Sequence, residues 1–141
     1  MKSSDYRHRI LYAEDDADSR ELVSLQCELS GIKVVTAETV GDAWATAQNE
    51  PFNLYLLDSR FPDGDGLDLC RRLRRFAPFA PILFYSGDAY EAHKQNGLAA
   101  GANGYLTKPY MADLAETISE TIENSEGFPP GSSGEFLYQT V

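Results

Sequence analysis

Short runs dominated by apolar residues recur along the chain, separated by longer segments with helical spacing. The five runs are Ile10–Ala13, Val34–Ala37, Leu54–Leu57, Ile82–Tyr85 and Gly104–Thr107. Apolar residues follow one another in these runs without strict alternation, which is typical of strands buried on both faces of a parallel sheet. We therefore predict a strand at each run.

The segments between these runs carry apolar residues at helical spacing. The stripes are Leu22, Leu25 and Leu29; Val40, Ala43, Trp44 and Ala47; Leu69, Leu73 and Phe76; and Leu114, Ile118 and Ile122. Each stripe lies on one face of a helix, which we expect to pack against the sheet. Ala89–Ala100 has few large apolar side chains and predicts a loosely held helix. Five strand–helix units predict an α/β fold, an open doubly wound sheet with helices on both faces.

Composition and charge narrow the function classes. The chain has 141 residues, of which 43% are apolar, enough for one domain with a full core. A formal net charge of −10 argues against general nucleic-acid binding, which needs a basic face. No apolar run approaches the ~20 residues of a membrane span, and the N-terminal segment lacks a signal peptide's apolar centre. Cys27 and Cys70 have no metal-ligand spacing and suit a reducing cytosol, so we expect a cytoplasmic protein.

Polar side chains follow four of the predicted strands, at the point where each strand ends. They are Glu14 and Asp15 after the first, Asp58 after the third, Ser86 after the fourth and Lys108 after the fifth. Ligands of open α/β sheets bind beyond the carboxyl ends of the strands. Taken singly, each residue has a simpler interpretation, since an acid after a strand often caps the next helix, as we expect of Asp16 or Asp18. Their convergence on one edge favours a functional site.

The residue types at this edge indicate phosphoryl chemistry. Clustered carboxylates repel one another, so we expect a cation between them. Oxygen ligands without His or Cys point to a hard cation, and Mg²⁺ is the preferred ion. Mg²⁺ held by carboxylates commonly shares a phosphate, whose oxygens Lys108 and Ser86 would bind. Asp58 would then act as a nucleophile and become an acyl phosphate.

These residues resemble the receiver domains of two-component response regulators. The motifs that carry the resemblance are "YAEDD" with Arg20 beyond it, "LLDSRFPDGDG", "PILFYSG" and "GYLTKP", in the family's order over roughly residues 8 to 124. The resemblance implies a flavodoxin-like fold of five β–α units with strand order 2-1-3-4-5. It also implies a phosphoacceptor domain rather than an enzyme, although such a domain can promote its own phosphorylation and dephosphorylation.

The resemblance assigns a role to each site residue. Asp58 matches the phosphoacceptor, and Glu14 and Asp15 match the acidic pair that binds Mg²⁺ together with Asp58 and the backbone carbonyl of Arg60. Ser86 matches the hydroxyl of the switch, Tyr105 its aromatic residue, and Lys108 the lysine that binds the phosphoryl group. The bond between Lys108 and Pro109 resembles the family's cis-proline turn.

The family also implies partners. We expect a sensor histidine kinase or a histidine phosphotransfer protein as phosphodonor, and a downstream protein partner that the sequence does not name. Nucleic acid and membrane are not expected partners. A homodimer through the face of the fourth helix, fifth strand and fifth helix is one option.

Three positions depart from the family pattern. Phe61 stands where Met is common, Arg60 where smaller residues are frequent, and Asp88 lies two residues past Ser86. We interpret Arg60 and Asp88 as residues that modulate the lifetime of the phosphoryl group, and predict an ion pair between them over the site.

Two alternatives remain open. One is a pseudo-receiver that binds partners without phosphorylation, against which the complete set of Asp58, the acidic pair and Lys108 counts. The other is an aspartate-nucleophile phosphatase, which is less favoured because that family places a second Asp where this chain has Arg60.

Outside the site, the remaining polar features have simpler interpretations. Arg71, Arg72, Arg74 and Arg75 predict a solvated basic face, and His93 an exposed helix residue. We expect a domain over residues 1–125 and a linker-like, disordered tail over 126–141, because "SEGFPPGSSG" has linker composition. No effector domain follows, so we expect output through protein contact, unless the chain is truncated.

Overall fold

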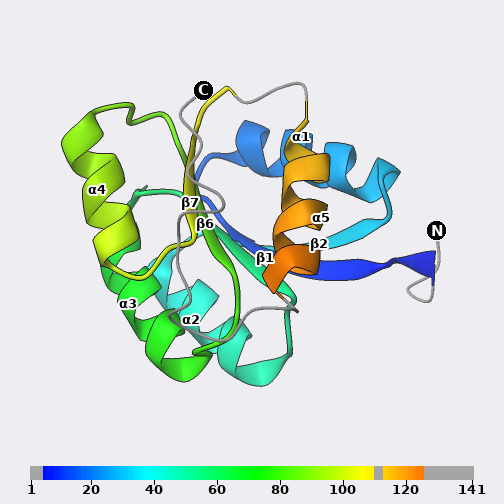
Figure 1. Ribbon diagram of the computed structural model, residues 1–141, viewed down its shortest axis with the longest axis horizontal. Coiled ribbons are helices and arrows are strands. Elements are labelled where there is room, and N and C mark those ends of the chain that lie inside the picture. Colours follow the sequence, from blue (N-terminus) through cyan, green and yellow to red (C-terminus); the bar gives the residue numbers. More distant parts are fainter. Residues whose placement is uncertain (1–4, 110–112, 126–141) are drawn as a thin grey trace.

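The structure is a computed structural model that describes residues 5–109 and 113–125. Its centre is a sheet of five parallel strands in the order β2-β1-β3-β6-β7 (Figure 1). The strands are β1 (His8–Ala13), β2 (Ile32–Ala37), β3 (Leu54–Leu57), β6 (Ile82–Ser86) and β7 (Gly104–Thr107). Because β6 and β7 are the fourth and fifth strands of this sheet, the predicted order 2-1-3-4-5 is confirmed.

Within the described residues, five helices cover the two faces of the sheet. They are α1 (Ala17–Leu29), α2 (Val40–Asn49), α3 (Gly66–Phe76), α4 (Glu91–Ala99) and α5 (Leu114–Ser125). Helices α1 and α5 pack on one face, and α2 and α3 lie on the other with α4 at its edge (Figure 1). None of these described helices has the length and apolarity that a membrane span requires.

Alternate residues of each strand point into two separate cores. Leu11, Leu57 and Phe84 belong to the core under α2 and α3, whereas Tyr12 and Leu56 belong to the core under α1 and α5. All of these side chains are buried. Burial on both faces explains why the strands show runs of apolar residues instead of alternation.

Side chains fix the start of three helices. Asp16, Thr39 and Asp65 are the N-cap residues of α1, α2 and α3, and each accepts a hydrogen bond from a backbone N–H of the first turn. The expectation that Asp16 or Asp18 caps a helix is met by Asp16. Helix α4 begins after Tyr90 without a side-chain cap.

The predicted core face of α1 is wrong. Leu22, Leu25 and Leu29 are exposed to 45%, 59% and 78%, whereas Val23 and Cys27 are the buried residues of this helix. Val23 and Cys27 are four residues apart, so they too form a stripe of helical spacing. Val23 and Cys27 therefore pack against the sheet, and the three leucines lie on the surface.

The interpretation of α3 also needs correction. Leu69 and Leu73 are buried as predicted, but Phe76 is half-exposed and packs edge-on against Trp44, with ring centroids 5.6 Å apart. Arg74 is not a solvated residue. Its guanidinium donates to the carbonyls of Ala80 and Gly101 at 2.6 and 2.8 Å.

Two further expectations concern single segments of the chain. The predicted fourth helix over Ala89–Ala100 is shorter in the structure, at Glu91–Ala99. The predicted tail over 126–141 lies outside the described residues.

Candidate functional site

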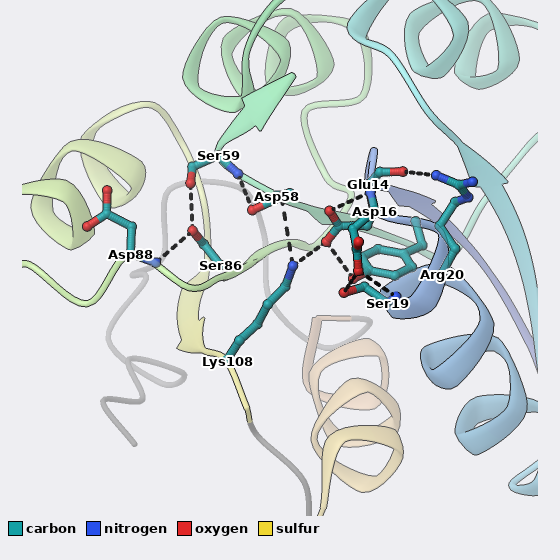
Figure 2. A network of polar contacts seen from close by, with 10 residues as sticks. Glu14, Asp16, Ser19, Arg20, Asp58, Ser59, Ser86, Asp88 and Lys108 are labelled. Carbon is teal, nitrogen blue, oxygen red and sulfur yellow. Dashed lines mark hydrogen bonds and ion pairs between the residues drawn. The ribbon is translucent and has the colours of Figure 1, made fainter. Parts of the chain in front are cut away.

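The carboxyl ends of four strands bring the predicted site residues together (Figure 2). Glu14 follows β1, Asp58 follows β3, Ser86 ends β6 and Lys108 follows β7. Parallel pairing continues past the strand ends, since the Asp58 N–H donates to the Ala13 carbonyl at 3.0 Å. The sheet therefore positions these side chains through their backbones.

Three carboxylates form a group that fits a divalent cation. One oxygen each from Glu14, Asp15 and Asp58 lies within 4.8 Å of the other two. Opposite oxygen ligands of one Mg²⁺ are about 4.2 Å apart, so small side-chain movements would bring all three into a coordination sphere. The donor set holds only oxygen, and Asp15 is exposed, which leaves room for further ligands on its side. The residues therefore fit Mg²⁺.

Glu14 lies at the buried side of this group. Its side chain accepts a hydrogen bond from the Tyr12 hydroxyl at 2.9 Å, and its backbone carbonyl accepts one from Arg20 at 2.9 Å. Burial raises the pKa of Glu14, the nearby Asp58 carboxylate raises it further, and Lys108 opposes the shift. A cation bound beside Glu14 would therefore stabilise its charged form further.

Lys108 supplies positive charge to the acidic group. Its Nζ atom forms an ion pair with Glu14 and lies 3.8 Å from Oδ2 of Asp58. The Lys108 backbone N–H donates to the Ser86 carbonyl at 2.8 Å, which fixes the lysine beside β6. The peptide bond to Pro109 is cis, as the resemblance to receiver domains implies.

The Asp58 carboxylate is held from two sides. The Ser59 N–H donates to Oδ1 at 2.8 Å, while Oδ2 faces Lys108 (Figure 2). One oxygen is thus fixed by the backbone, and the other lies beside the cation.

A chain of hydroxyl contacts links Asp58 to the region before α4. Ser59 Oγ and Ser86 Oγ are 2.6 Å apart, and the Asp88 N–H donates to Ser86 Oγ at 3.1 Å. The Tyr105 hydroxyl donates to the Asp88 carbonyl at 2.8 Å. Tyr105 is buried and stacks on Phe84, with ring centroids 5.5 Å apart. Burial raises the pKa of its phenol.

The predicted ion pair between Arg60 and Asp88 is absent from the described part of the chain. The Asp88 carboxylate instead pairs with Nδ1 of His93 in the first turn of α4, five residues further on. Arg60 is exposed on the short strand β4 (Arg60–Phe61). Asp88 is thus paired with His93, which is close in the chain, and not with Arg60 as predicted.

The loop after Asp58 is a small hairpin that the sequence did not predict. Strand β4 pairs antiparallel with β5 (Gly64–Asp65), with Phe61 buried in the core. Asp63 at its turn accepts hydrogen bonds from the N–H groups of Val40 and Gly41, at 2.8 and 3.0 Å. The hairpin therefore caps the first turn of α2.

Sequence reasoning missed three residues that shape the site. Ser59 contacts Ser86, Asp63 ties the hairpin to α2, and Gly66 packs against the Asp58 backbone. The acidic, glycine-rich "DGDG" segment was the available signal for Asp63 and Gly66, whereas nothing local to Ser59 indicates its contact across the sheet edge.

Comparison with known proteins supports the geometry. The family model for the response regulator receiver domain matches residues 10–119. The chain belongs to this family. The receiver fold and site account for the observed strand order and the acidic group, and the phosphatase interpretation is set aside.

The chain aligns with different shares of its relatives' lengths. PhoP of Bacillus subtilis, a transcriptional regulatory protein of alkaline phosphatase synthesis, is 31% identical over 88% of this chain and 52% of its own. The chain spans about half the length of several such curated relatives. The response regulator receiver protein CpdR of Brucella abortus is 34% identical over 81% of this chain and 96% of its own.

Solved receiver structures match over most of the chain. A CheY-like receiver domain protein from Methanospirillum hungatei is 32% identical, with a TM-score of 0.80 over 84% of this chain and 96% of its own. A beryllofluoride-activated DrrB receiver domain is 26% identical, with a TM-score of 0.75 over 82% of this chain and 97% of its own.

Proposed function

We propose that this receiver domain is an active, Mg²⁺-dependent phosphoacceptor that carries the phosphoryl group on Asp58. The observation that supports it most directly is the position of Asp58, whose carboxylate lies between two further acids and Lys108. A pseudo-receiver has no need of this complete set. The expected donor is a sensor histidine kinase or a histidine phosphotransfer protein.

In the proposed reaction, a carboxylate oxygen of Asp58 attacks the phosphorus of the donor. A P–O bond to Asp58 forms, the bond from phosphorus to the donor's imidazole nitrogen breaks, and its electron pair leaves with the imidazole. Glu14, Asp15, Asp58 and the Arg60 carbonyl would hold Mg²⁺, which offsets the charge of the phosphoryl oxygens. Lys108 would bind one of those oxygens as a point charge.

Phosphorylation would then change the face beside α4. The new group carries roughly −1.5 to −2 charges and three acceptor oxygens, to which Ser86 would donate. Asp88 accepts from Tyr105, so movement of Ser86 reaches the buried phenol through two contacts. We expect the altered surface of α4, β7 and α5 to bind a downstream protein, and a homodimer through this face stays a prediction.

Two further assignments belong to this proposal. Arg60 and Asp88 would modulate the phosphoryl lifetime, but separately, because they form no pair with each other in the described chain. A cytoplasmic location agrees with the free, buried thiols of Cys27 and Cys70.

The test is phosphorylation of the purified protein by acetyl phosphate with Mg²⁺, followed by mass spectrometry. We expect one acyl phosphate on Asp58 in the wild type and none in Asp58→Ala. EDTA in place of Mg²⁺ should abolish the modification. A wild-type protein that stays unmodified and also fails to bind beryllofluoride would support the pseudo-receiver instead.

A further inference from the structure

The hydroxyls of Ser59 and Ser86 meet directly beside the phosphoacceptor. Their Oγ atoms are 2.6 Å apart, and Figure 2 shows the two side chains pointing toward one another next to Asp58. Ser59 is the residue after Asp58, and Ser86 is the last residue of β6. The contact therefore joins the phosphoacceptor segment to the switch serine.

Burial indicates which serine donates in this pair. Ser86 is only 2% exposed, so its single proton needs a protein acceptor, and Ser59 Oγ lies at hydrogen-bond distance. One lone pair of Ser86 Oγ already accepts from the Asp88 N–H. Ser59 is only partly buried and can give its own proton to water. Ser86 donating to Ser59 thus satisfies both hydroxyls.

This arrangement conflicts with the role of Ser86 after phosphorylation. Phosphoryl oxygens are acceptors only, so Ser86 must offer them its one proton. It must therefore give up Ser59 as its acceptor. An ionised acceptor binds a hydroxyl more strongly than a neutral one does, so the exchange favours the phosphoryl group.

We propose that Ser59 is a positioning residue. Its Oγ atom accepts the hydrogen bond of the Ser86 hydroxyl until a phosphoryl group on Asp58 competes for that hydrogen bond. Ser59 thereby opposes the active arrangement in the unmodified protein. The inference rests on the proposed function of Asp58. It also reaches Tyr105, because Ser86 and Tyr105 both contact the backbone of Asp88.

The experiment is a titration with beryllofluoride and Mg²⁺, followed by NMR chemical shifts. Beryllofluoride stands for the phosphoryl group and needs no covalent step. Removing the competing acceptor with Ser59→Ala should tighten binding about fivefold, which is about 1 kcal/mol at 1.4 kcal/mol per tenfold change. Ser59→Thr keeps the hydroxyl and should bind like the wild type.

A second background separates positioning from packing. In Ser86→Ala the proton in question is gone, so adding Ser59→Ala should leave the affinity unchanged. Circular dichroism checks the fold of each variant. If Ser59→Ala does not fold, Ser59→Cys serves in its place, since a thiol is a weaker acceptor.

The outcomes distinguish this inference from the proposed function. If the wild type binds beryllofluoride and Ser59→Ala binds it equally or more weakly, the role of Ser59 is overturned, while the proposed function stands. A gain that persists in the Ser86→Ala background would also overturn it, because the effect would not pass through Ser86. Failure of the wild type to bind beryllofluoride would overturn the proposed function and this inference with it.

Discussion

Gly66 lies so close to the carbonyl oxygen of Asp58 that a Cβ atom at residue 66 would overlap that oxygen. The same Cβ atom would lie 3.0 Å from the Phe84 ring and 3.1 Å from Cα of Ser59. Helix α3 thus begins in direct contact with the backbone of Asp58.

Gly66→Ala should therefore displace Asp58. We expect it to lower the free energy of unfolding by about 1–3 kcal/mol, as over-packing does elsewhere, and to slow phosphorylation of Asp58. Urea unfolding and acetyl phosphate labelling measure the two effects. Gly87→Ala is the matched control, since its Cβ would meet nothing within 4 Å. Equal effects of the two substitutions would contradict the steric explanation.

Arg74 should be irreplaceable by lysine. Its guanidinium donates to the carbonyls of Pro78, Ala80 and Gly101 and to the side chain of Asn103. A lysine has three donors on one atom and cannot span these acceptors. We expect Arg74→Lys to cost about 1–3 kcal/mol in urea unfolding.

The control is Arg75→Lys, on the exposed side of the same helix. We expect a change within about 0.5 kcal/mol there. A comparable loss in both variants would assign the effect to general arginine chemistry rather than to these hydrogen bonds.

Asp63 should make stability depend on pH in the acid range. Hydrogen bonds from the N–H groups of Gly41 and Val40 lower the pKa of Asp63 below its ordinary value of ~3.9. The stabilisation is therefore fully present above that ordinary value and is lost as the pH falls through the folded-state pKa. Asp63→Asn should be less stable than the wild type at neutral pH, and the difference should shrink below about pH 4. Urea midpoints across this range would refute the assignment if the difference stayed constant.

Asp15 should contribute to Mg²⁺ affinity although it is exposed. Asp15→Asn removes one charged oxygen ligand of the three-carboxylate group and should weaken Mg²⁺ binding at least about tenfold. NMR titration with Mg²⁺ measures this. Asp18→Asn, an exposed acid in the first turn of α1, should bind Mg²⁺ like the wild type.

The two faces of α1 should differ in their contribution to stability. Leu25→Ala removes an exposed side chain and should change the free energy of unfolding by less than about 0.5 kcal/mol. Val23→Ala opens space in the core and should cost about 1–3 kcal/mol. A larger loss of unfolding free energy in Leu25→Ala than in Val23→Ala would contradict this assignment of the buried face.

The fate of α1 shows how far the sequence alone carries. Strand positions were predictable because burial on both faces forces apolar runs, and the strand ends then placed Asp58 and Lys108. Helical spacing alone does not identify the buried face when a helix has two apolar stripes. Leu22, Leu25 and Leu29 form one stripe and Val23 and Cys27 another, and only packing against β1 and β2 decides between them.

Side-chain partners at the site were less predictable than positions. Arg60 and Asp88 lie near the same edge with opposite charges, yet Asp88 pairs with His93. The geometry of the turn into α4 brings His93 to Asp88, and no pattern of charges specifies such a turn. Ser59 was missed for a different reason, because its partner Ser86 is distant in the chain and is brought close only by the pairing of β3 with β6.

The two ends of helix α4 are held by different contacts, since His93 of the first turn pairs with Asp88 and the last turn adjoins Arg74. Arg74 binds the Gly101 carbonyl just beyond its last turn, whereas its first turn follows Tyr90 with no capping side chain. Gly97 lies between these ends and packs tightly on the sheet. A Cβ atom added there would lie only 3.1 Å from the rings of Phe84 and Tyr105. Because Asp88 contacts both Ser86 and His93, we expect a rearrangement of the segment from Ser86 to Ala89 to displace the first turn of α4 more than its last turn.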